Sequence, residues 1–253
     1  MLLVARRAKI KELILEKKSV TVAELSKLFS VTEETIRRDL KALEDEGVLT
    51  RTYGGAFIQD GVQNDIDINI RETLYVANKE KIATQCASLI HHGDSIFLDA
   101  STTSLFIATK IKDKRITVLT NSLKVINTLS DSTAVRLIAT GGVLASQSMS
   151  FLGRSAINSM KEFFVDKAFI SCRSISMEHG ITDSNEQQAE VRHLAIKRAN
   201  EVYLVVDYTK FNKTSFTHIC DFNEINAIVV DTKLDENWHN FLSEQNITIV
   251  ESN

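Results

Sequence analysis

Proline is absent from the 253-residue sequence, and cysteine and aromatic residues are scarce, with three cysteines and 7% Phe, Trp and Tyr. Without proline, glycine and clusters of polar residues must mark every turn. Cys86, Cys172 and Cys220 are widely spaced and show no metal-ligand pattern, and the histidines give no ligand spacing either. We therefore expect free thiols in a reducing compartment, no metal site and no cofactor.

Long apolar runs are missing too. No stretch of about 18 apolar residues suggests a membrane span, although 43% of the residues are hydrophobic, which is ordinary for a folded protein. Residues 1–7 lack the long apolar core of a signal peptide, so we expect a cytoplasmic protein without a membrane partner. The length suits one small and one medium domain.

No strong excess of one charge is present, since the net charge is −3. Residues 1–58 hold 11 Lys and Arg against 9 Asp and Glu, whereas residues 59–253 hold 19 against 24. Such a balance is weak for a nucleic-acid binder. The case for one must rest on where the basic residues lie.

A strongly amphipathic segment, residues 32–46, predicts a helix. Thr32 fits its N-cap, and acidic residues follow in the first turn. Arg38 and Lys41 lie roughly opposite the apolar stripe, with Arg37 on its flank. The stripe itself consists of apolar residues at positions i, i+4 and i+7, namely Ile36, Leu40 and Leu43.

Shorter elements surround this helix. Thr21–Glu24 has the form of a capping box for a preceding helix, and a tight turn at 29–31 joins the two helices. Gly47 fits the stop after the second helix. Residues 49–58 then predict two short strands around Gly54–Gly55, a pair that tolerates the positive φ of a tight turn. This order is typical of a winged helix-turn-helix domain.

A charged, solvated helix without DNA affinity is the alternative, but the capping box, tight turn, paired arginines and glycine hairpin together favour DNA binding. A helix over residues 3–17 completes the predicted domain, residues 1–58. We expect Arg38 to contact a base and Arg37 a phosphate. Arg51 and Tyr53 lie two apart and so on one face of the wing. The predicted DNA contacts are Arg6, Thr32, Thr35, Arg37, Arg38, Lys41, Arg51 and Tyr53.

Residues 59–78 are polar with little periodicity and form a predicted linker. Over residues 79–253, short β-branched runs alternate with amphipathic segments, which predicts an α/β domain with a mainly parallel sheet covered by helices. The predicted strands are 95–98, 116–119, 135–139, 167–171, 202–206, 227–230 and 248–250. The predicted helices are 79–90, 102–111, 122–129, 186–200 and 235–245.

Polar residues follow most of these strands. In open α/β sheets, ligands bind outside the carboxyl ends of the strands, and amides at helix starts suit a phosphate. Any single Ser, Thr or Asn there is also a plain N-cap, but six such strand ends favour a ligand crevice. No strict phosphate-loop or dinucleotide pattern is present. The candidate effector-binding residues are Asp99, Ser101, Thr102, Thr103, Asn121, Gly141, Gly142, Arg173, Asp207 and Lys210.

Two motifs, Thr35–Leu40 (Thr-Ile-Arg-Arg-Asp-Leu) and Tyr53–Ala56 (Tyr-Gly-Gly-Ala), resemble the signature of the DeoR family of bacterial sugar-catabolism regulators. The strand-end segments 99–103, 120–122, 140–142, 180–182 and 207–211 resemble that family too. The resemblance implies a winged helix-turn-helix domain followed by a sensor domain similar to ribose-5-phosphate isomerases. It also implies a repressor of a sugar-utilisation operon that a phosphorylated sugar releases from DNA.

This chain departs from the family pattern in having Ser101 and Arg173–Ser174 where glycine is frequent. These departures bear on which sugar phosphate binds rather than on the fold.

Two other functions compete with a regulator. An isomerase acting on sugar phosphates needs a carboxylate base and an electrophile, which Asp99, Asp207, Glu186 and Lys210 would supply, but the winged domain has no role in such chemistry. A module that binds a partner protein but not DNA is disfavoured, because Arg37, Arg38 and Arg51 lie where a winged helix-turn-helix contacts DNA. We therefore expect that this chain is not an enzyme. One helix contacts only a few base pairs, so we also expect a homo-oligomer, a dimer or tetramer, on double-stranded operator DNA.

Overall fold

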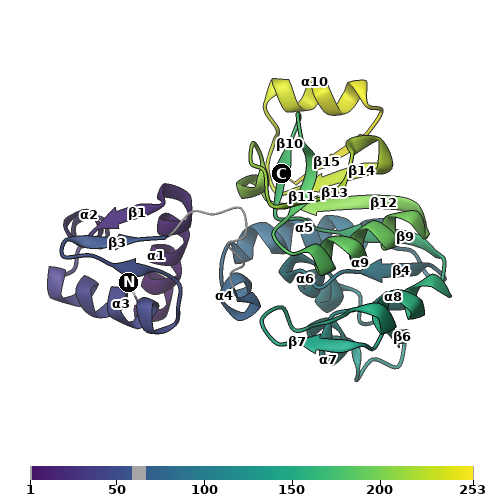
Figure 1. Cartoon of the computed structure of the whole chain (residues 1–253), viewed down its shortest axis with the longest axis horizontal. Helices are drawn as coiled ribbons and strands as arrows, with labels where there is room; N and C mark the ends of the chain where they lie inside the picture. Colours follow the sequence, from purple (N-terminus) through teal and green to yellow (C-terminus); the bar gives the residue numbers. More distant parts are fainter. Residues whose placement is uncertain (1, 59–66, 253) are drawn as a thin grey trace. The chain divides into compact units, whose positions relative to one another are not determined.

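The computed structural model describes residues 2–58 and 67–252 and divides into two compact units, Met1–Val76 and Ala77–Asn253 (Figure 1). The predicted boundaries, with a linker at 59–78, differ in detail. Residues 59–66 lie outside the described part of the chain, and residues 67–76 are grouped with the first unit.

The first unit begins with three helices, and the capping predicted from the sequence forms. Thr21 and Glu24 make the reciprocal capping box, and the Thr32 hydroxyl accepts a hydrogen bond from the Thr35 N–H. Gly47 follows with φ 73°, the left-handed conformation that ends a helix without a Cβ clash. The helices are α1 (Leu3–Lys17), α2 (Val22–Phe29) and α3 (Glu33–Asp45).

A three-stranded sheet forms the wing, whereas two strands were predicted. Neither Gly54 nor Gly55 has a positive φ, so the expected turn geometry is wrong. Gly55 is needed for another reason: a Cβ there would lie 2.1 Å from the Val20 carbonyl oxygen, because the first strand crosses close to it. The strand order is β1 (Ser19–Thr21), β3 (Gly55–Phe57) and β2 (Thr50–Arg51), all antiparallel.

The core of the first unit joins all of these elements. Ile10 and Ile14 of α1 and Leu43 of α3 are fully buried, and Val20 and Ala56 of the wing are buried in the same core. A further short helix, α4 (Ile68–Glu72), belongs to this unit. It is held to α1 because Glu12 accepts a hydrogen bond from the Tyr75 N–H at 3.0 Å.

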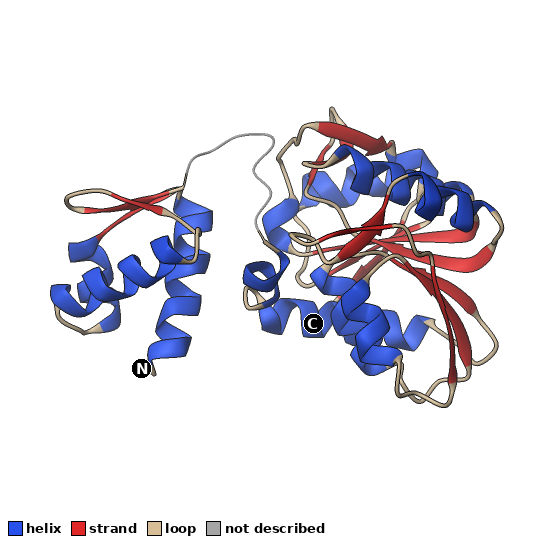
Figure 2. Ribbon diagram, turned by 60° about the horizontal axis from the view of Figure 1, so that its bottom comes forward, coloured by secondary structure: helices blue, strands red, loops and turns tan. Residues whose placement is uncertain are grey.

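The second unit is built on a seven-stranded sheet in which every pairing is parallel, as the apolar runs predicted (Figure 2). Successive residues pack on opposite faces: Ile96 and Leu98 belong to one core and Phe97 to the other. In spatial order the strands are β15 (Thr248–Glu251), β14 (Ala227–Val230), β12 (Ala199–Val206), β9 (Val165–Ile170), β4 (Ser95–Leu98), β5 (Ile116–Thr120) and β6 (Val135–Ala139).

Helices cover both faces of this sheet, in agreement with the predicted α/β architecture. One face carries α5 (Val76–Leu89), α6 (Thr102–Lys110) and α7 (Leu123–Leu129). The other carries α8 (Arg154–Lys161), α9 (Glu186–Lys197) and α10 (Glu236–Glu244). Among the described residues, no helix is both long and apolar enough to cross a bilayer.

Two small antiparallel sheets complete the second unit and were not predicted. One is a hairpin of β7 (Val143–Ala145) and β8 (Ser150–Leu152). The other has the order β10 (Ser174–Ser176), β11 (Gly180–Asp183) and β13 (Thr217–Cys220). Short 3₁₀ turns, η1 (Tyr208–Lys210) and η2 (Phe222–Glu224), follow β12 and β13.

Candidate DNA-binding face and effector site

The outer side of α3 presents the predicted DNA contacts to solvent. Arg38 is exposed, and its side chain forms no hydrogen bond or ion pair with any residue that the structure describes. Arg37 is exposed as well, but its guanidinium contacts Glu33 at 3.0 Å and the Tyr53 carbonyl oxygen at 3.4 Å. Lys41 is exposed one turn beyond. The two neighbouring arginines therefore differ, because only Arg38 has its whole donor fork available.

At the wing, Arg51 is half-exposed and Tyr53 is fully exposed at the tip. The Arg51 Nε lies 2.7 Å from one Glu44 carboxylate oxygen, and the Arg51 N–H donates to the other at 2.9 Å. Thr32 and Thr35 sit at the start of α3, where their hydroxyls lie 2.9 Å apart. Seven of the eight predicted DNA contacts thus belong to α3, its cap or the wing.

The eighth predicted contact, Arg6, is buried and does not lie on this face. Only 7% of Arg6 is exposed, and its Nε lies 2.6 Å from Asp39, which also accepts a bond from Arg7 at 3.0 Å. Asp39 is itself 1% exposed. Arg6 therefore joins α1 to α3 inside the unit and has no surface to offer a phosphate.

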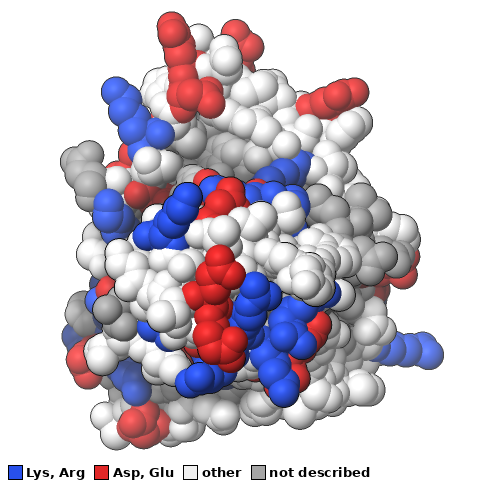
Figure 3. Space-filling model, turned by 90° about the vertical axis from the view of Figure 1, so that its left-hand side faces the viewer, with Lys and Arg blue, Asp and Glu red and all other residues white. Residues whose placement is uncertain are grey.

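Basic and acidic side chains lie side by side on the face drawn in Figure 3 rather than forming one basic field. This agrees with the nearly balanced charge of residues 1–58. Long-range attraction to the phosphate backbone is therefore modest, and a few well-placed bases must supply affinity.

All the predicted effector residues follow strands of the parallel sheet, so they gather at its carboxyl edge. Asp99 follows β4, Asn121 follows β5, and Gly141 and Gly142 follow β6. On the other side, Arg173 comes shortly after β9, and Asp207 and Lys210 follow β12. From β4 the chain builds β5 and β6 in one direction and β9, β12 and β14 in the other. The point between β4 and β9 is therefore the topological switch, where ligands bind in such sheets.

A buried ionic cluster occupies this switch point. Asp99 is 1% exposed and its two oxygens accept four hydrogen bonds from protein groups. The Arg192 Nε of α9 lies 2.7 Å from Asp99, and another Arg192 nitrogen is paired with Asp183 of β11. Burial alone would raise the pKa of Asp99, but the Arg192 guanidinium and serine donors outweigh it and hold the pKa below its usual range.

This cluster corrects the role expected of several residues. Asp99 has no free acceptor for a sugar hydroxyl, because Ser101, Ser104, Ser171 and Arg192 fill its oxygens. The hydroxyl of Ser101 is likewise engaged as the N-cap of α6, where it accepts from the Ser104 N–H at 3.0 Å. Both residues hold the site together rather than offer free groups to a ligand.

Asp207 behaves similarly. It is 3% exposed, and one of its oxygens accepts hydrogen bonds from the backbone and hydroxyl of Thr209. Its neighbour Asp231 accepts from the Tyr208 N–H at 2.8 Å and from the Asn78 side chain at the start of α5. These bonds fix the turn that carries Lys210.

Some groups at the edge remain open. The N–H groups of Thr102 and Thr103, the first of α6, donate to no acceptor within the described residues. Asn121 is completely buried; its Nδ2 donates to the Phe151 carbonyl at 3.2 Å, but its Oδ1 has no hydrogen-bond partner in the described structure. A buried acceptor without a partner is costly, so Asn121 calls for a donor.

Glycine and two cationic side chains complete this edge. Gly142 has φ 118°, and a Cβ there would lie 2.8 Å from the Leu152 carbonyl oxygen, so only glycine fits at this position of the loop. Arg173 is half-buried and forms no side-chain hydrogen bond or ion pair within the described part of the chain. Lys210 lies in the 3₁₀ turn that follows β12, the neighbour of β9 in the sheet. Amide donors and cations for an anion, and an acceptor for a hydroxyl, thus meet at one edge.

Sequence reasoning missed Arg192, Asp183 and Gln188. Gln188 of α9 is 6% exposed and donates to the Ser150 hydroxyl at 2.7 Å, which joins the β7–β8 hairpin to the same helix. The available signal was position: Arg192 lies three residues from both Ala189 and Ala195, on the apolar side of the predicted helix 186–200. A charged residue at such a position must be paired.

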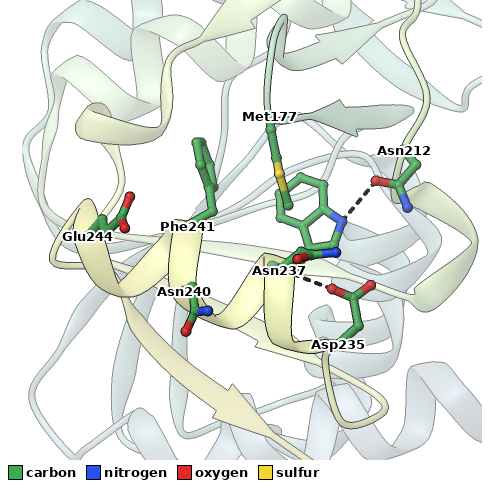
Figure 4. A pocket seen from close by; sticks show the side chains of 8 residues that line it. Met177, Asn212, Asp235, Asn237, Asn240, Phe241 and Glu244 are labelled. Atoms are coloured by element: carbon green, nitrogen blue, oxygen red, sulfur yellow. Dashed lines mark hydrogen bonds between the residues drawn. The ribbon is translucent and has the colours of Figure 1, made fainter.

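Another hollow, of about 460 Å³, lies beside α10 (Figure 4). Its floor includes Trp238, whose Nε1 donates to Asn212 at 2.9 Å, and Asp235 and Glu244 stand at its rim. The lining contains amides and carboxylates but no Lys or Arg. It therefore suits an anionic effector less well than the sheet edge does.

A winged helix-turn-helix joined to an α/β domain with a polar strand edge defines a DNA-binding transcriptional regulator with its own sensor domain. Comparison with known families agrees: residues 6–61 match the DeoR-like helix-turn-helix domain, and residues 75–232 match the DeoR C-terminal sensor domain. The chain belongs to the DeoR family of transcriptional regulators.

Full-length relatives support this. The chain is 39% identical to the uncharacterized HTH-type transcriptional regulator YulB of Bacillus subtilis, over 93% of this chain and 91% of that one. It is 32% identical to the transcriptional repressor GlcR of the same organism, over 91% and 89%. It is also 32% identical to the L-fucose operon activator of Haemophilus influenzae, over 91% and 92%. The chain is therefore a regulator rather than an enzyme.

Solved structures resemble the second unit more distantly. Ribose 5-phosphate isomerase A from Methanocaldococcus jannaschii matches with a TM-score of 0.39 and 15% identity, over 53% of each chain. Translation initiation factor eIF-2B from Pyrococcus horikoshii matches with a TM-score of 0.45 and 16% identity, over 64% of this chain and 66% of that one. The α/β architecture described above rests on the strand order itself.

Proposed function

We propose that the chain represses an operon for sugar utilisation and that a phosphorylated sugar, bound at the carboxyl edge of the parallel sheet, releases it from its operator. The observation that carries this proposal is the set of open groups around the switch point. Two helix-start amides and the Arg173 guanidinium are the open groups that suit a phosphate, and Lys210 is a second cation after the neighbouring strand. The partnerless Asn121 Oδ1 suits a hydroxyl of the sugar.

At the DNA, Arg38 is the proposed base contact, because its donors are uncommitted and it projects from α3 away from the core. Arg37, Lys41, Arg51, Tyr53, Thr32 and Thr35 would fix the unit on the phosphate backbone. Because a regulator works where its operator is, the location proposed for this chain is the cytoplasm.

Assembly follows from the small footprint of one recognition helix. Specific operator binding calls for at least two copies on repeated half-sites. We expect the sensor unit to supply most of the contact between copies. Residues 1–60 alone should then be monomeric and bind DNA far more weakly than the whole chain.

The effector can act only through different affinities for the DNA-binding and released arrangements. A coupling of about 1–3 kcal/mol corresponds to roughly a 5–150-fold loss of operator affinity. The name of GlcR, a repressor, and that of the fucose operon regulator, an activator, both describe control of transcription. We favour a phosphosugar as the effector of this chain because Arg173 and Lys210 supply cations at neighbouring strand ends.

The test begins with a duplex enriched from a random-sequence pool by the full chain. The bound duplex is then titrated with pentose and hexose phosphates and with the same sugars lacking phosphate. Release by one or more phosphorylated sugars, and by none of the unphosphorylated ones, supports the proposal. Equal release by a sugar and its phosphate would remove the role assigned to the cations, and enrichment of no duplex would remove the DNA-binding role.

A further inference from the structure

One flank of α3 holds the wing at two places. Arg37 and Glu44 are seven residues apart, two helical turns, and therefore lie on the same side of the helix. Arg37 donates to the carbonyl of Tyr53 at the wing tip, and Glu44 accepts from Arg51 at the end of β2. The two contacts span the turn of the hairpin.

The contact between Glu44 and Arg51 is the stronger of the two. Both carboxylate oxygens of Glu44 are used, one by the Arg51 N–H at 2.9 Å and one by its Nε at 2.7 Å. A single carboxylate thus fixes both the backbone and the side-chain direction of Arg51. These bonds also lower the pKa of Glu44, the backbone bond most of all, so the carboxylate stays charged at neutral pH.

Two opposite consequences for DNA binding are conceivable. If Glu44 only neutralised Arg51, the carboxylate would compete with DNA phosphates, and its removal would strengthen DNA binding. If Glu44 orients Arg51, its removal would free the wing and weaken binding, because an ordered contact loses less entropy on association. The geometry favours the second consequence, because the Nε–carboxylate bond occupies one edge of the guanidinium and leaves other N–H donors of its five for a phosphate.

We propose that Glu44 is a positioning residue for DNA binding: it holds the wing against α3 and aims Arg51 at the phosphate backbone. This inference rests on the DNA-binding face assigned above. It gives an acidic residue on the DNA-binding unit a positive role in affinity, which charge alone would not predict.

The experiment uses the full chain and a duplex that the wild-type chain enriches from a random-sequence pool. Affinity is measured by fluorescence anisotropy for wild type, Glu44→Ala and Asp45→Ala. Asp45 is the matched control, because it is the next residue of α3, is exposed, and its side chain makes no hydrogen bond or ion pair with the described residues. Glu44→Ala should weaken binding about fivefold, the scale of one lost hydrogen bond, whereas Asp45→Ala should leave it unchanged or strengthen it.

A second readout separates positioning from general loss of structure. In an Arg51→Ala background, Glu44→Ala should weaken binding less than it does in the wild-type chain, because the guanidinium that Glu44 orients is gone and only its bond to the residue 51 backbone N–H remains to be lost. Thermal unfolding of each variant checks that the unit stays folded. Stronger or unchanged binding by Glu44→Ala overturns the proposal, as does a full loss that persists without Arg51. A wild-type chain that enriches no duplex overturns the proposed function itself, and the inference with it.

Discussion

The two units use polar residues in opposite ways. On the outer side of α3, Arg38 stands in solvent with its donors uncommitted. At the sheet edge of the sensor unit, Asp99 and Arg192 are buried: Asp99 accepts four hydrogen bonds, one of them from Arg192, and Arg192 also pairs with Asp183. A site that meets a large, charged partner exposes its contacts. A site for a small ligand first builds a rigid frame and leaves only a few groups open within it.

A charged residue in the DNA-binding unit can have either of two roles, a buried structural one or an exposed one that contacts DNA. Arg6 and Asp39 belong to the DNA-binding unit by sequence, yet they form a buried pair like that of Asp99 and Arg192. Arg38 is one residue from Asp39 and points the other way. Neighbouring positions on one helix therefore divide between holding the unit together and contacting DNA.

The largest loss of stability is expected when the buried cluster of Asp99, Arg192 and Asp183 is broken. Arg192→Met leaves Asp99 and Asp183 buried without their cation, which should cost about 3–5 kcal/mol of unfolding free energy. Urea unfolding followed by the fluorescence of Trp238, the single tryptophan of the chain, reports on this unit. Arg173→Met is the control, because the same charge is removed from an unpaired position, and it should cost less than about 1 kcal/mol. Equal losses in the two variants would contradict the assigned frame.

The wing offers a matched pair of glycines. Gly55→Ala places a Cβ against the Val20 carbonyl and should destabilise the first unit by about 1–3 kcal/mol, as overpacking does. Gly54 has open space around the same position and no positive φ, so Gly54→Ala should stay within about 0.5 kcal/mol. Thermal unfolding by circular dichroism measures both. Equal changes in stability for Gly54→Ala and Gly55→Ala would contradict the close approach of β1 to Gly55.

Affinity should respond at the exposed face without a loss of stability. Arg38→Ala is expected to cost about 1–3 kcal/mol of binding free energy on the enriched duplex and to relax discrimination at one base pair. A mixed-sequence duplex is the comparison, because a phosphate contact would weaken both DNAs alike. Unchanged binding in the Arg37→Ala, Arg38→Ala double variant would show that α3 does not contact the DNA.

A small change in stability is also expected at Asn121. Asn121→Leu loses one hydrogen bond to Phe151 but also removes the buried Oδ1 that has no partner. These terms oppose each other, so the unfolding free energy should change by less than about 1 kcal/mol. A much larger loss would mean that the Oδ1 is satisfied within the protein and is not held for a ligand.

Much of this organisation was predictable from local pattern. The helix at residues 3–17, both caps of the helix-turn-helix and the seven parallel strands follow from apolar periodicity and capping residues. The strands of the small sheets were not predictable, because three or four residues beside glycines and turns carry little periodicity. The hairpin at Gly54–Gly55 was predicted, but its geometry depends on β1, which no local signal places.

The sequence predicted which polar residues gather at the sheet edge, but not which of them bind other protein groups and which stay open. Strand ends identify which residues gather there, since parallel strands share one carboxyl edge. Whether Asp99 is open or engaged depends on Arg192, which lies 93 residues away in the sequence. Partners at such separation become visible only in the folded chain.

The most direct test of the sensor assignment is release of the bound duplex by a phosphosugar in wild type and in Asn121→Leu. The effector is the phosphosugar that releases the wild-type chain in the titration described above. Asn121→Leu should bind the duplex with wild-type affinity but resist release at the concentration that frees the wild-type chain. Release of both chains at the same concentration would contradict the placement of the effector at the carboxyl edge of the sheet.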